Sequence, residues 1–128
     1  MKRHLSILFF LLFATQSSFA QEPESYIKQK IVYKSETFIE KTGNRGLLTK
    51  ALNVYYVEDD LQTVTAYEKE NKKIWTLNII KVLGKPKVGK PIIRFIKLSQ
   101  NTLHVTYGKH SFAEIDLRNG KVISSGSD

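Results

Sequence analysis

Cysteine is absent from all 128 residues, and this absence excludes several kinds of chemistry. The chain can form no disulfide, no thiol nucleophile and no cysteine-ligated zinc site. No cysteine stands near the N-terminus to carry a bacterial lipid anchor either. The stability of the folded chain must therefore come from packing and hydrogen bonding.

Long apolar runs are also missing, with one exception at the N-terminus. A basic stretch, Lys2 to His4, precedes an apolar run from Leu5 to Ala14, and small residues follow at Ser18 and Ala20. This is the pattern of a secretory signal peptide. We expect residues 1–20 to be cleaved after Ala20, which makes the protein periplasmic or secreted.

A membrane anchor is the alternative reading of the same run. A spanning helix needs roughly 20 apolar residues, and polar residues interrupt this run from Thr15 to Ser18. The sequence therefore favours the signal peptide and predicts no membrane span.

Acidic residues are fewer than basic ones: the chain has 12 Asp and Glu and 20 Lys and Arg, which gives a net charge of +8. Loss of Lys2 and Arg3 lowers this charge to +6. A basic exported protein favours acidic partners, such as an acidic protein or an anionic glycan or surface. Nucleic acid is not expected, because an exported protein seldom meets it.

The segment 21–128 has the size of one domain and alternates apolar-rich runs with turn residues. We predict an all-β domain of eight or nine antiparallel strands, because the runs are rich in Val, Ile, Tyr, Phe and Thr. The predicted strands are Tyr26 to Lys34, Thr37 to Lys41, Leu52 to Val57, Thr63 to Glu68, Lys73 to Ile80, Ile92 to Leu98, Thr102 to Tyr107, Ser111 to Leu117 and Lys121 to Ser124.

Turn residues separate these strands. Asn119-Gly120 predicts a type I′ hairpin turn, in which both central residues have positive φ, and Glu70 to Lys72 predicts a looser one. A single helical turn is expected near Gly46 to Ala51. The segment Gly84 to Pro91 contains two Gly-Lys-Pro triplets and must be an exposed connection, because proline cannot donate to a central ladder.

The two halves of the domain align on each other at an offset of about 48 residues, a period typical of propeller blades. Identical residues coincide at four places: Asn53 and Asn101, Val57 and Val105, Asn71 and Asn119, Lys73 and Lys121. The alternative is a single domain without an internal duplication.

These half-repeats resemble blades of the pyrroloquinoline-quinone-type β-propeller repeat. The second half carries the apolar strand, acidic residue and Asn-Gly-Lys turn of that motif at Phe112, Asp116, Asn119, Gly120 and Lys121, and the first half offers Tyr67, Glu68, Asn71, Lys73 and Trp75. The resemblance implies a pair of blades packed face to face, or a fragment completed by oligomerisation. It implies no cofactor, because the quinone site of the family is built by the full ring.

Three groups of residues have side chains suited to binding or catalysis. The acidic cluster Glu58-Asp59-Asp60 has oxygen ligands suited to calcium, but a solvated hairpin end is the favoured interpretation. His104, His110, Glu114 and Asp116 are the only titratable group dense enough for acid–base work, and a surface turn is favoured over a catalytic site. Tyr55, Tyr56, Tyr67 and Trp75 could stack on sugars if exposed, and core packing is favoured. Strand alternation predicts that Tyr55 and Tyr56 face opposite ways, with one of them exposed.

The basic segment is the strongest candidate site. Six cations fall within seventeen positions: Lys81, Lys85, Lys87, Lys90, Arg94 and Lys97. The plain alternative is a solubilising loop that guards the sheet edges. We predict a non-enzymatic binding or accessory module that engages an acidic partner through Lys85, Lys87, Lys90 and Arg94, with no metal and no cofactor. The alternatives are a small hydrolase or lyase using His110 and Glu114, and a structural envelope protein.

Overall fold

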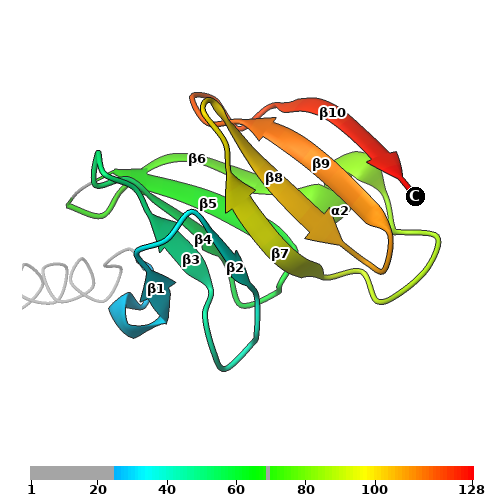
Figure 1. Ribbon diagram of the computed structural model, residues 1–128, viewed down its shortest axis with the longest axis horizontal. Coiled ribbons are helices and arrows are strands. Elements are labelled where there is room, and N and C mark those ends of the chain that lie inside the picture. The colour runs from blue at the N-terminus through cyan, green and yellow to red at the C-terminus, as the bar shows by residue number, and fades with distance from the viewer. Residues whose placement is uncertain (1–24, 69) are drawn as a thin grey trace, which may run out of the picture.

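Two five-stranded sheets pack face to face in the chain (Figure 1). The computed structural model describes residues 25–68 and 70–128, so the predicted signal peptide lies outside the described residues. The first sheet has the order β1 (Ile31–Val32), β3 (Gly46–Leu48), β4 (Val54–Val57), β5 (Thr63–Glu68) and β6 (Lys72–Asn78). The second has the order β10 (Val122–Ser127), β9 (Ser111–Asp116), β8 (Thr102–Tyr107), β7 (Ile93–Leu98) and β2 (Glu36–Phe38).

The all-β prediction is confirmed, with ten strands in place of eight or nine. All neighbouring strands are antiparallel except β1 and β3, which pair in parallel. Among residues 25–68 and 70–128, helical structure is limited to a 3-10 turn, η1 (Lys28–Lys30), and a short helix, α2 (Ile79–Leu83). Over residues 25–68 and 70–128, neither is long and apolar enough to span a membrane.

One apolar core fills the space between the sheets. On β8 the alternation places Leu103 and Val105 at 0% exposure and Tyr107 at 5%, while His104 and Thr106 face outward. Val64 from β5 and Ile115 from β9 lie in the same cluster, so side chains of both sheets share one core. The two sheets therefore form one domain.

A second apolar cluster covers the outer face of the first sheet. Tyr55 and Tyr56 do face opposite ways, but both are buried, so the expectation that one is exposed is wrong. Tyr26 packs over Tyr56 and Tyr67, with ring centroids 6.2 and 5.3 Å apart. The segment before β1 lies outside the sheet because it covers these rings. Of the strand predicted from Tyr26 to Lys34, only the two residues of β1 are extended in the sheet, and η1 precedes them.

Two local predictions of secondary structure were wrong, one of a helical turn and one of a strand end. The residues from Gly46 to Leu48 form β3, and the turn comes later, where the Leu52 N–H donates to the Thr49 carbonyl at 2.9 Å. The strand predicted up to Ile80 ends at Asn78, whose side chain accepts from the Lys81 N–H and starts α2. The apolar sequence of α2 is rich in β-branched residues, which favour strands, so only the capping asparagine marked the helix.

The hairpin between β9 and β10 forms as predicted, but its turn is different. Gly120 has φ +75°, whereas Asn119 does not have positive φ, and the Gly120 N–H donates to the Asp116 carbonyl at 2.9 Å. The loop is thus longer than a two-residue type I′ turn. At the other hairpin both Glu70 and Asn71 have positive φ, as a type I′ turn requires.

Strands β3–β6 and β7–β10 occupy matching stretches of the sequence. Strand β9 begins and ends 48 residues after β5, and β8 begins 48 residues after β4. Each run of four strands is an antiparallel meander within its own sheet. A common origin of the two halves, and their kinship to propeller blades, stay predictions.

Candidate functional site

The basic loop between α2 and β7 is held against the turn that joins β8 and β9. The Lys109 N–H donates to the Val88 carbonyl at 2.8 Å, and the Gly108 N–H donates to the Ile92 carbonyl at 3.0 Å. A Cβ atom on Gly108 would lie 2.4 Å from Pro86 Cβ, so only glycine allows this approach. The loop is exposed and outside the strands, yet its backbone is fixed.

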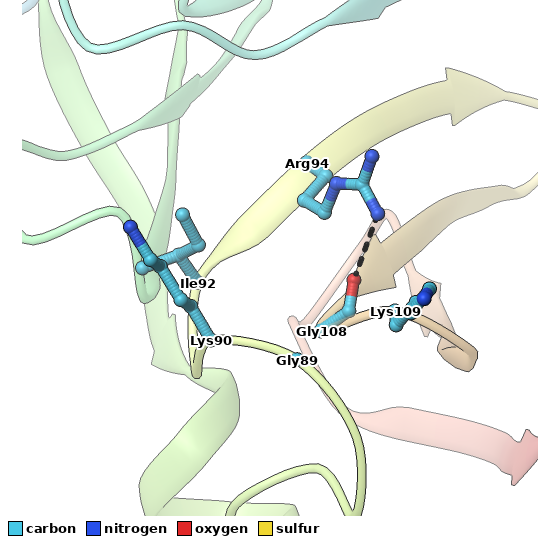
Figure 2. A pocket seen from close by; sticks show the side chains of 6 residues that line it. All are labelled: Gly89, Lys90, Ile92, Arg94, Gly108 and Lys109. Carbon is cyan, nitrogen blue, oxygen red and sulfur yellow. Dashed lines mark hydrogen bonds between the residues drawn. The ribbon is translucent and has the colours of Figure 1, made fainter.

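A depression of about 250 Å³ opens where the loop meets the turn. Figure 2 shows Lys90 and Ile92 on one side of it and Arg94 and Lys109 on the other, with the backbone of Gly89 and Gly108 at its edge. The Arg94 guanidinium donates from Nη1 to the Gly108 carbonyl at 3.4 Å. This contact orients the guanidinium and leaves further N–H donors for a ligand.

Two of the four predicted site residues line the depression and two do not. Lys90 and Arg94 line it, whereas Lys85 and Lys87 are exposed farther along the loop. Lys109, which sequence reasoning missed, lines it from the neighbouring turn. We call these five residues, Lys85, Lys87, Lys90, Arg94 and Lys109, the basic surface.

The charge of the basic surface is not neutralised nearby. From Asn71 to Ala113 the sequence has nine Lys and Arg and no Asp or Glu. In the part of the chain that the structure describes, no carboxylate lies within 4 Å of the five cations. Lys97 is different, because its ammonium is 3.9 Å from Glu36 on β2. The surface can therefore bind anions such as carboxylates, phosphates or sulfates without first breaking an ion pair.

The sheet register brings together His104 and Glu114 of the predicted titratable group and leaves His110 apart from them in a turn. His104 and Glu114 are direct neighbours on β8 and β9, and the His104 Nδ1 is hydrogen-bonded to the Glu114 carboxylate. His104 Nε2 lies 3.2 Å from the Thr106 hydroxyl. His110 is in the β8–β9 turn, and it lines a depression of about 230 Å³ together with His104. Glu114 is thus engaged by His104 and not by His110.

The dyad of His104 and Glu114 is accessible to solvent on the outer face of the second sheet. Both side chains are about 30% exposed on an open sheet face. Strand β8 is paired on both sides, with β7 and with β9. The pairing of β8 with β7 has a register shift opposite Thr106 and Tyr107.

The three carboxylates of the acidic cluster accept hydrogen bonds from three different parts of the fold. Glu58 accepts from the Tyr67 hydroxyl at 3.1 Å, and Asp59 accepts from Arg45 at 2.9 Å. Asp60 accepts from the backbone of Gln62 and Thr63 at 2.8 and 2.9 Å. Within residues 25–68 and 70–128, no three Asp, Glu or His side chains are grouped as ligands for one metal ion.

Asp60 should make the stability of the fold depend on pH in the acid range. Burial acts to raise the pKa of Asp60, but hydrogen bonds from Gln62 and Thr63 outweigh it and hold the pKa below its ordinary value. A lowered folded-state pKa stabilises the fold above about pH 4, and this contribution is lost as the pH falls through the folded pKa. We expect urea unfolding between about pH 6 and about pH 2 to show a decline that is smaller in Asp60→Asn. An identical decline in both proteins would contradict this role. Part of the decline should persist in the variant, because hydrogen bonds from Arg118 also lower the pKa of Asp116.

No family model and no curated protein matches the chain.

Proposed function

We propose that this chain is an exported, non-enzymatic binding module that engages an acidic protein or an anionic glycan through the basic surface. The observation that carries the proposal is a set of five exposed cations without carboxylate partners, among the described residues, on a backbone held by hydrogen bonds. A fixed backbone lowers the entropic cost of ordering a site on binding. Export is supported by the N-terminal sequence pattern alone.

The depression supplies the recognition element within this surface. Arg94 has a planar fork of N–H donors that matches carboxylate, sulfate and phosphate groups, and Lys90 and Lys109 add point charges around it. Exposed cations farther out, at Lys85 and Lys87, increase the local concentration of an anionic partner by long-range attraction. The interaction should therefore weaken as salt is raised.

Charge reversal tests the proposal. The variant K85E/K87E/K90E should elute from immobilised heparin and from immobilised polyglutamate at clearly lower salt than the unmodified mature chain. The control variant K72E/K73E/K121E makes the same change in net charge at exposed lysines outside the depression. We expect the control to lose much less retention. Equal losses in the two variants would show that only net charge matters, and the proposal would then be wrong.

The hydrolase alternative through His110 and Glu114 has weaker support. Glu114 is hydrogen-bonded to His104, and His110 lies in the turn of the β8–β9 hairpin. No contact between His110 and Glu114 brings the two together as an acid–base pair among the described residues.

A further inference from the structure

A groove at the other end of the sheets has no part in the proposed function. It consists of two depressions, of about 270 and 280 Å³, and both are lined by Tyr33 and Leu48. Ligand sites usually have volumes from about 300 Å³ upward, so each depression alone is small and the pair reaches this range. Figure 1 shows β1, which contributes Ile31 to the groove, on the left, and the β8–β9 turn, which contributes Gly108 and Lys109 to the basic depression, on the right.

The walls of the groove are apolar. Tyr26, Ile31 and Val54 line the first depression from the outer face of the first sheet. Leu98 lines the second, where the segment after β1 crosses from one sheet to the other. Tyr33 stands on this crossing segment between the two depressions, and it is 66% exposed. Its ring has no aromatic neighbour among the residues that the structure describes.

The margin of the groove is positively charged. Lys28 lines the first depression, and Lys34 and Lys50 line the second. All three lysines are exposed, and no carboxylate lies within 4 Å of them over the described ranges 25–68 and 70–128. No acidic side chain lines either depression. A ligand that complements this groove has an apolar body and an anionic head.

We propose that the groove binds a single-chain anionic amphiphile, a long-chain carboxylate, with its alkyl chain against Tyr33 and Leu48 and its carboxylate beside the lysines. A neutral apolar ligand would leave the lysines without a partner, and a small anion would leave the apolar walls exposed to water. The long-chain carboxylate satisfies both features at once. This site is independent of the basic surface and needs none of its five cations.

The test uses octanoate, decanoate and dodecanoate as monomers with the mature chain, and measures affinity by calorimetry. Burial of each methylene is worth about 0.8 kcal/mol, so affinity should rise by up to about fourfold per methylene. Dodecyltrimethylammonium should bind clearly more weakly than dodecanoate, because its head is cationic. Equal binding of the two amphiphiles, or no gain with chain length, would overturn the proposal.

Variants locate the site. Tyr33→Asp should weaken dodecanoate binding at least about tenfold, because it places a carboxylate in the apolar wall and repels the ligand head. Phe38→Asp is the matched control, since Phe38 is equally exposed, at 69%, on the outer face of the second sheet. Lys34→Glu and Lys50→Glu should each weaken binding about two- to fivefold. If Tyr33→Asp and Phe38→Asp have the same effect, binding is not in the groove.

Two further outcomes separate this proposal from others. The variant K85E/K87E/K90E should keep its affinity for dodecanoate, because the three lysines lie outside the groove. Dodecanoate binding can therefore be present even if the proposed function of the basic surface is wrong. Binding to vesicles of phosphatidylglycerol, without binding of monomeric dodecanoate, would point to a membrane surface and overturn the small-ligand site.

Discussion

Replacing Arg45 with alanine should lower the free energy of unfolding by about 3–5 kcal/mol. Arg45 is 1% exposed, and its guanidinium donates to the Val57 carbonyl at 2.8 Å, to the Lys41 carbonyl at 3.0 Å and to Asp59 at 2.9 Å. Its charge also lies over the Tyr56 ring, 5.4 Å from the centroid. Truncation would leave a cavity and remove the donor from the buried Val57 carbonyl, and an unpaired buried group costs about 1–3 kcal/mol.

Urea unfolding of three further variants separates the causes. Arg45→Met keeps most of the side-chain volume, so its decrease in the free energy of unfolding reports the contribution of the hydrogen bonds. Arg45→Lys keeps the charge but cannot donate to three acceptors in a fixed plane, and we expect an intermediate loss. Asp59→Ala should cost less than Arg45→Ala, because Asp59 is 86% exposed and water can replace its carboxylate. An Arg45→Ala protein within about 1 kcal/mol of the parent would contradict this structural role.

The sequence patterns predicted three strands of the second sheet, β7, β8 and β9, to within one residue at each end. Thr102–Tyr107 matches β8 at both ends, because Leu103, Val105 and Tyr107 alternate cleanly with polar residues. The same period of two correctly placed Tyr55 and Tyr56 on opposite faces of the strand, but the expectation that one of them is exposed was wrong. A sheet with one solvated face would expose one of them, but Tyr26 covers that face, and such long-range cover leaves no local signal in the sequence.

The candidate site was predictable only in part. The basic loop is visible as a cluster of cations, and its prolines and glycines place it outside the strands. The contribution of Lys109 depends on the contact between the loop and the β8–β9 turn. Arg45 was missed for a related reason, since a lone arginine beside Gly46 resembles a solvated turn residue until its distant acceptors are known. Pairing of Glu114 with His104 follows from strand register, which neither sequence segment specifies alone.

Replacing Gly120 with alanine should lower the free energy of unfolding by about 2–4 kcal/mol, from two causes that can be separated. Gly120 has φ +75°, where a side chain is strained. In addition, a Cβ atom there would lie 2.6 Å from Trp75 Cδ2 and Cε3. Trp75 cannot easily move, because its indole N–H donates to the Leu117 carbonyl at 2.8 Å and so joins β6 of the first sheet to the hairpin of the second.

Gly84→Ala is the matched control for the backbone strain. Gly84 has φ +87°, and a Cβ atom at this position would meet nothing within 4 Å. Gly84 also has ψ 172°, a conformation that only glycine readily adopts, so its loss of about 1–3 kcal/mol sets an upper limit on the cost of positive φ without a clash. The excess at Gly120 should largely disappear in a Trp75→Leu background, where the ring is gone but the positive φ is kept. If Gly120→Ala costs as much in the Trp75→Leu background as in the parent, the tryptophan does not press on the turn, and the two sheets are joined by the shared apolar core without this contact.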